Sequence, residues 1–132
     1  MSFKVVNCTP LGESEYAMEV LGKIGAEYIE QWCTTEDTII DATEDADAVI
    51  SAVLENLAPF SRNTIEKLTN CKMIVAMSVG YENIDVDAAT EHGICVCNVP
   101  DYCLDEMSDH TMALLLSCAR KIVKLNNDIR KG

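Results

Sequence analysis

The chain has 132 residues, of which 48% are hydrophobic and 24% charged, and its formal net charge is −12. This length is enough for one domain with an apolar core. The acidic balance argues against nucleic acid and anionic membrane surfaces as partners. The sequence contains neither an apolar run of roughly 20 residues nor a signal-peptide layout, so we expect a cytoplasmic protein that does not enter a membrane.

Strand-like and helix-like segments alternate along the first hundred residues. The predicted elements are, in order, a strand at 3–8, a helix at 13–25, an edge strand at 26–33, one or two helical turns in 34–45, a strand at 46–55, a helix at 61–70, a strand at 72–79, a helix at 85–93 and a strand at 94–99. The segments 46–55 and 72–79 are nearly all apolar, which is typical of strands buried on both faces. Such regular alternation predicts an α/β fold with a doubly wound parallel sheet.

Several of these helices carry recognisable end signals. The expected N-terminal caps are Thr34 or Thr35, Ser61 and Asp85. In the first helix, Glu13 suits the start and Gly25 the end. Its apolar side chains, Tyr16, Val20 and Ile24, recur at helical spacing.

The last element is different, because apolar residues recur in steps of three and four from Leu104 to Ile129. Asp101 can cap this helix, and Asp105 and Glu106 lie in its first turn. A helix of roughly 26 residues is about 39 Å long, whereas a domain of this size has a radius of gyration of about 14 Å. Its own sheet cannot cover such a helix, so another domain or subunit should pack against it.

Seven cysteines require an explanation: Cys8, Cys33, Cys71, Cys95, Cys97, Cys103 and Cys118. An odd number, mostly within apolar runs, favours buried thiols in a reducing compartment. Cys95 and Cys97 share one face of a strand, but a metal site would need further ligands. Only His92 and His110 are available, so we expect no metal.

Ligands of open α/β sheets bind outside the carboxyl ends of the strands. These ends fall at Thr9-Pro10, Leu54-Glu55-Asn56, Ser78-Val79-Gly80 and Asn98-Val99-Pro100. Ser78-Val79-Gly80 is the best candidate anion site, because Gly80 can adopt the positive φ that a nest of N–H groups requires and Ser78 adds a hydroxyl. A plain strand-to-helix turn remains the open alternative.

No catalytic set is complete. His92 stands at a helix end beside Gly93, which suits a surface histidine, and His110 stands next to Asp109 on the long helix, which suits an interface or solvated histidine. The sequence has no GxGxxG, GxSxG or Walker P-loop.

Two segments nevertheless carry a family likeness. VAMSVGYENIDVDAATEHGICVCNVP, followed by a helix that ends in LLLSCARK, resembles the NAD-dependent D-isomer-specific 2-hydroxyacid dehydrogenases. The C-terminal binding protein corepressors are similar too, especially at ICVCNVP. The resemblance is clear over residues 64–132, and residues 1–63 fit in strand and helix order.

The resemblance implies a flavodoxin-like substrate-binding domain at 1–100, then a hinge and long helix at 101–132 that packs on a Rossmann domain and on a dimer partner. It implies that the backbone of Ser78, Val79 and Gly80 binds the substrate carboxylate. Val79 and Met107 would lie near the nicotinamide of NAD(H) or NADP(H), and Asn98 would be structural. The family's GxGxxG and its catalytic arginine, glutamate and histidine have no counterparts here, so this chain alone should bind no cofactor tightly and catalyse nothing.

Departures from the family pattern bear on the substrate. Many members carry arginine where this chain has Ala76, and glycine where it has Ser78. The lost cation favours a small monocarboxylate such as glyoxylate, hydroxypyruvate or pyruvate over a phosphorylated acid. An alternative function is a stand-alone interaction module that dimerises through residues 104–129.

Overall fold

The computed structural model describes residues 3–12, 14–54 and 57–132 and contains two compact units, residues 1–100 and 101–132. Each unit is considered by itself. The strands are β1 (Lys4–Asn7), β2 (Glu27–Glu30), β3 (Ala48–Ser51), β4 (Met73–Ala76) and β5 (Cys95–Cys97). The helices are α1 (Glu15–Gly22), α2 (Glu36–Thr43), α3 (Arg62–Ile65), α4 (Val86–Glu91), α5 (Leu104–Ala119) and α6 (Ile122–Lys131).

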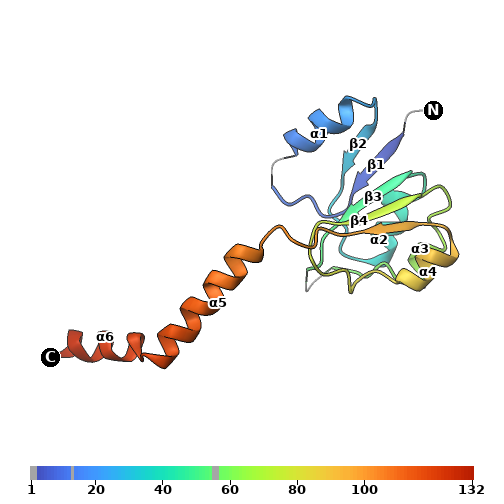
Figure 1. Ribbon diagram of the computed structural model, residues 1–132. Helices are drawn as coiled ribbons and strands as arrows, with labels where there is room; N and C mark the ends of the chain where they lie inside the picture. The colour runs from blue at the N-terminus through green and yellow to red at the C-terminus, as the bar shows by residue number, and fades with distance from the viewer. Residues whose placement is uncertain (1–2, 13, 55–56) are drawn as a thin grey trace. The chain divides into compact units, whose positions relative to one another are not determined.

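The first unit is built on a five-stranded sheet with the order β2-β1-β3-β4-β5, in which every neighbouring pair is parallel (Figure 1). This is the flavodoxin-like order of a doubly wound sheet, in which the chain first moves to one side of β1 and then to the other. The predicted α/β fold is therefore confirmed, including the edge position of β2.

One row of side chains across the sheet forms the centre of the core. The strand register aligns Ile29, Val6, Val49, Ile74 and Val96 on one face. Val6, Val49 and Ile74 are fully buried. Buried side chains of the three helices α2, α3 and α4 complete the same core cluster: Ile39, Ile65, Ala88 and Ala89.

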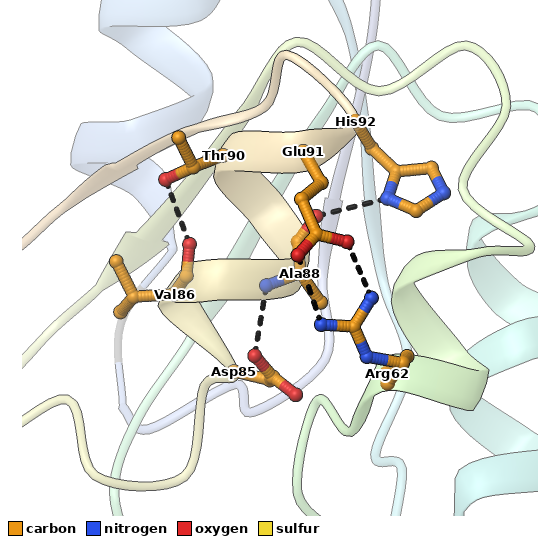
Figure 2. Close-up of polar contacts among 7 residues, drawn as sticks. All are labelled: Arg62, Asp85, Val86, Ala88, Thr90, Glu91 and His92. Carbon is orange, nitrogen blue, oxygen red and sulfur yellow. Dashed lines mark hydrogen bonds and ion pairs between the residues drawn. The ribbon is translucent and has the colours of Figure 1, made fainter.

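Polar contacts connect the helices of this layer, in which α2 packs on α3 and α3 packs on α4. Arg62 of α3 donates to both carboxylate oxygens of Glu91 at 2.6 and 3.3 Å (Figure 2). This bond lowers the pKa of the exposed Glu91 carboxyl. Asn63 of α3 donates to Glu36 of α2 at 3.3 Å.

The three expected caps of this unit are confirmed. The side chains of Thr35, Ser61 and Asp85 each accept from a backbone N–H three residues further along the chain. Asp85 has the shortest of these bonds, 2.8 Å to the amide of Ala88 (Figure 2). Glu13, expected at the start of the first helix, lies outside the described residues.

The opposite face of the sheet is less covered than the apolar strand sequences predict. Helix α1 contacts β2, but none of its residues is buried, and Tyr16 is 77% exposed. Met73 and Cys95, which are paired across β4 and β5, are both exposed. The prediction that residues 72–79 are buried on both faces is therefore wrong for β4, because Met73 is 38% exposed.

The second unit corrects the prediction of one helix over 104–129. The chain forms α5 and α6 with a break between them, where Lys121 has the left-handed conformation at φ 54°. Arg120 and Lys121 place positive charge at the C-terminal end of α5, which suits the helix dipole, whereas the apolar period continues through the break. The predicted cap Asp101 is also wrong, since Cys103 precedes α5 and its side chain makes no capping bond.

Candidate functional site

The turn after β4 is formed by Ser78, Val79 and Gly80, and all three of its carbonyl groups accept hydrogen bonds. The amide of Val99 donates to Ser78 O at 3.0 Å, and Asn98 Nδ2 donates to Val79 O at 2.8 Å. The hydroxyl of Ser78 donates to Gly80 O at 2.7 Å. These bonds hold the turn against the end of β5.

The backbone N–H groups of the same three residues make no hydrogen bonds of this kind within the described part of the chain. Within the described part of the chain, the N–H groups of Ser78, Val79 and Gly80 donate to no acceptor. Val79 is 45% exposed, so water reaches the turn. Unpaired amides at the carboxyl end of a strand are suited to a small anion such as a carboxylate.

Two details of the predicted nest are wrong. Gly80 does not have a positive φ, so its backbone does not form the predicted nest of N–H groups. The Ser78 hydroxyl closes the turn by donating to Gly80 O and does not add an outward donor. Any anion site here rests on the backbone amides alone.

Glu82 is the residue that the sequence reasoning missed. A Cβ atom on Gly80 would lie 2.3 Å from Glu82 Oε2, so the carboxylate rests against the α-carbon of Gly80. Glu82 does not belong to a helix, because α4 begins only at Val86. The signal available was the spacing, since an acid two residues after a turn glycine can fold back over it.

A cavity of about 260 Å³ lies beside this turn, and it is lined by Tyr81, Val86, Val96, Cys97 and Asn98. Asn98 belongs both to this cavity and to the hydrogen bond that holds Val79.

The other strand ends contribute less. Thr9 is buried, and its hydroxyl accepts from the amide of Ala52 at 3.3 Å, which makes it structural. Glu55 and Asn56 lie outside the described residues.

Neither histidine is placed for catalysis in its own unit. The Nδ1 atom of His92 lies 2.9 Å from the carbonyl oxygen of Ala88 at the end of α4, which is a local helix-end contact (Figure 2). His110 is exposed on α5.

The residues expected near the cofactor belong to different units of the chain. Val79 lies in the first unit and Met107, which is 62% exposed, lies on α5 of the second. The chain has no glycine-rich fingerprint to hold a pyrophosphate. The residues present therefore do not fit a whole dinucleotide.

The cysteines divide into a buried and an accessible group. Cys8, Cys33 and Cys71 are buried, as predicted, and burial raises the pKa of each thiol. The prediction is wrong for Cys95 and Cys118, which are exposed. All seven thiols are free, and the described residues contain no group of three or more His, Cys, Asp or Glu that could hold a metal.

Comparison with known proteins identifies the family. The D-isomer specific 2-hydroxyacid dehydrogenase catalytic domain matches residues 5–125, and the chain belongs to this family. It is 33% identical over 129 residues to the D-3-phosphoglycerate dehydrogenase of Methanocaldococcus jannaschii, covering 98% of this chain and 24% of that protein. It is 33% identical over 96 residues to the glyoxylate reductase of Pyrococcus furiosus, covering 73% of this chain and 28% of that protein.

Solved structures agree with the fold. A glyoxylate reductase from Paecilomyes thermophila superposes with a TM-score of 0.83 at 24% identity, over 99% of this chain and 42% of that one. Structures of similar fold include a 3-phosphoglycerate dehydrogenase with bound NAD+ and a D-lactate dehydrogenase with NAD and lactic acid. The chain thus spans about a quarter to two-fifths of the length of these relatives. Among the described residues, no helix has the length and apolar character needed to cross a bilayer.

Proposed function

We propose that residues 1–100 are the substrate-binding domain of an enzyme that interconverts a small 2-hydroxy acid and its 2-oxo acid with NAD or NADP. Residues 101–132 would be the hinge and helices that pack on a dinucleotide-binding domain and on a dimer partner. The observation that carries this proposal is the turn at 78–80, whose carbonyls are all bonded while its amides have no partner among the described residues. Family membership supplies the reaction class.

In this proposal the amides of Ser78, Val79 and Gly80 bind the substrate carboxylate. A hydrogen bond to a charged group contributes roughly 1.5–3 kcal/mol, so two or three such bonds hold a small acid weakly. Val79 and Met107 would contact the nicotinamide in the full-length protein. The free thiols are consistent with a cytoplasmic location.

Binding of glyoxylate to the ¹⁵N-labelled chain tests the site by amide chemical shifts. We expect the largest changes at residues 78–80, and much smaller changes with glycolamide, which is neutral. Equal shifts with both compounds, or glyoxylate shifts confined to other residues, would show that the turn is not a carboxylate site.

The chain alone should also leave NADH unoxidised in the presence of glyoxylate, because it carries no complete catalytic set. Absorbance of NADH over time is the measurement. Turnover by the purified 132-residue chain would show that the missing groups are not needed.

Glu82 makes the turn selective for small monoanions in this proposal. Its carboxylate rests against the α-carbon of Gly80, within the turn, and two charges about 4 Å apart in water repel by about 1 kcal/mol. Glu82→Gln should therefore tighten glyoxylate binding by about fivefold, and the gain should be larger for 3-phosphoglycerate. The measurement is the same titration at low ionic strength.

The matched control is Glu66→Gln, which makes the same charge change on an exposed residue outside the turn. If both variants improve binding equally, net charge and not the position of Glu82 is responsible. Wild-type protein that binds 3-phosphoglycerate more tightly than glyoxylate would contradict the assigned substrate class.

A further inference from the structure

The thiols of Cys95 and Cys97 form a pair that the proposed dehydrogenase function does not use. Their sulfur atoms lie 3.8 Å apart, and both belong to β5. Side chains alternate along a strand, so both thiols stand on the face opposite Val96. Cys95 is exposed and Cys97 is half-buried, which leaves the pair open to a small ion.

A third sulfur lies next to this pair. Strand β5 is at the edge of the sheet and pairs only with β4, in a register that places Met73 opposite Cys95. Neighbouring strands are about 4.8 Å apart, and the side chain of Met73 is exposed on the same face. The sheet therefore places a thioether on the strand beside the two thiols, directly across from Cys95 and on the same face.

We propose that Cys95 and Cys97, with Met73 beside them, bind a soft monovalent ion of the copper(I) class. Thiolate and thioether sulfur select copper(I) over hard cations. Binding exchanges two S–H protons for two metal–sulfur bonds, so one ion enters and two protons leave without any change of oxidation state.

The geometry favours an ion over a disulfide. With metal–sulfur bonds of about 2.3 Å, two sulfurs on a tetrahedral or trigonal ion are about 3.8–4.0 Å apart, which matches the observed 3.8 Å. In contrast, a disulfide needs sulfurs about 2.05 Å apart and Cα atoms within about 6.8 Å. Alternate residues of a strand are about 6.6 Å apart, which is at the upper end of that range and beyond the usual ~5.5–6 Å, so a bridge would draw β5 together.

The same geometry disfavours structural zinc. Zinc sites of that kind have four protein ligands. The described residues offer no group of three or more His, Cys, Asp or Glu, and the thioether of Met73 is not among the Cys, His, Asp and Glu ligands of zinc sites. A two-thiol site with a neighbouring methionine is better matched to an ion of low coordination number.

The test is a competition between the reduced 132-residue chain and a chromophoric copper(I) chelator under argon. The loss of the chelator complex gives both the stoichiometry and the affinity. We expect one tightly bound copper(I) per chain, weakened at least 30-fold by Cys95→Ser or Cys97→Ser and about 3- to 10-fold by Met73→Leu. An equal concentration of Zn²⁺ should not displace it.

The matched control is Cys118→Ser, which removes an exposed thiol on α5 and should leave the affinity unchanged. Because Cys95 is exposed, its replacement by serine should not disturb the core, and circular dichroism checks this. Three results would each overturn the proposal: no stoichiometric binding by wild type, an equal loss in Cys118→Ser, or displacement by Zn²⁺. A Cys95–Cys97 disulfide in freshly reduced protein, detected by mass, would overturn it as well.

Discussion

Individual residues at the turn after β4 have roles that differ from those their types indicate. Ser78 closes the turn through Gly80 O, and Gly80 leaves room for the Glu82 carboxylate without positive φ. The strand-turn pattern in the sequence was enough to select residues 78–80. It was not enough to assign each atom, because the partner of a hydroxyl or carboxylate is decided by what folds next to it.

At the same scale, the buried thiols should make the free energy of unfolding depend on pH. Burial, followed by the neighbouring Cys33, raises the pKa of Cys8, and burial also raises the pKa of Cys33 and Cys71. A raised folded pKa means that stability is fully present below the unfolded pKa of about 8.5 and is lost as the pH rises toward the folded value. Between its unfolded and its folded pKa, the Cys8 thiol should lower the free energy of unfolding by about 1.4 kcal/mol per pH unit.

Urea unfolding in reductant between pH 8 and 10 measures this slope. Cys8→Ala should make the change of the unfolding free energy with pH smaller by about 1.4 kcal/mol per pH unit, which is the contribution of one thiol. Cys118→Ala, at an exposed position, should not change this slope. Identical slopes in wild type and Cys8→Ala would mean that Cys8 ionises equally in both states.

At the scale of elements, the helix caps were predicted correctly because the group that each cap binds lies nearby in the sequence. Thr35, Ser61 and Asp85 cap their helices as predicted, since the amide that each binds is only three residues away. The break at Lys121 was missed because the apolar period continues across it and neither glycine nor proline marks it.

The cap of α4 offers a direct test of the predicted helix ends. Asp85→Ala removes the 2.8 Å bond to the amide of Ala88 and should lower the free energy of unfolding by about 1 kcal/mol. Asp87→Ala is the control, since this acid is in the same helix turn, exposed, and not the cap. Similar losses in urea unfolding for both variants would assign the effect to the helix dipole and not to the cap.

At the scale of the whole molecule, the exposed apolar surface of α5 and α6 is the feature that the second unit does not explain by itself. None of their residues is buried. Large apolar side chains are exposed along both helices: Leu104, Met107, Met112, Leu114, Leu115, Leu116, Ile122, Val123, Leu125 and Ile129. Such a surface is typical of an interface, which supports both the proposed dimer and the alternative function as a stand-alone interaction module.

Light scattering on the purified chain tests this surface. We expect a dimer through residues 104–129, and Leu115→Asp should shift it to a monomer by placing a charge among the apolar side chains. Asn127→Asp adds the same charge at an exposed polar position and should leave the dimer intact. A wild-type monomer at all concentrations would exclude self-association through these helices.

The sequence by itself determined the element order, the parallel α/β class and the position of the turn, because strand and helix periodicity, caps and turn residues are local properties of the chain. Tertiary structure alone decided that Met73, Cys95 and Cys97 share an exposed face and that Glu82 lies over Gly80. Strand register brings Met73 beside Cys95, which is distant in sequence, and a one-residue change of register would move the side chains of a strand to the other face. The position of the Glu82 carboxylate depends on how the turn after Gly80 folds.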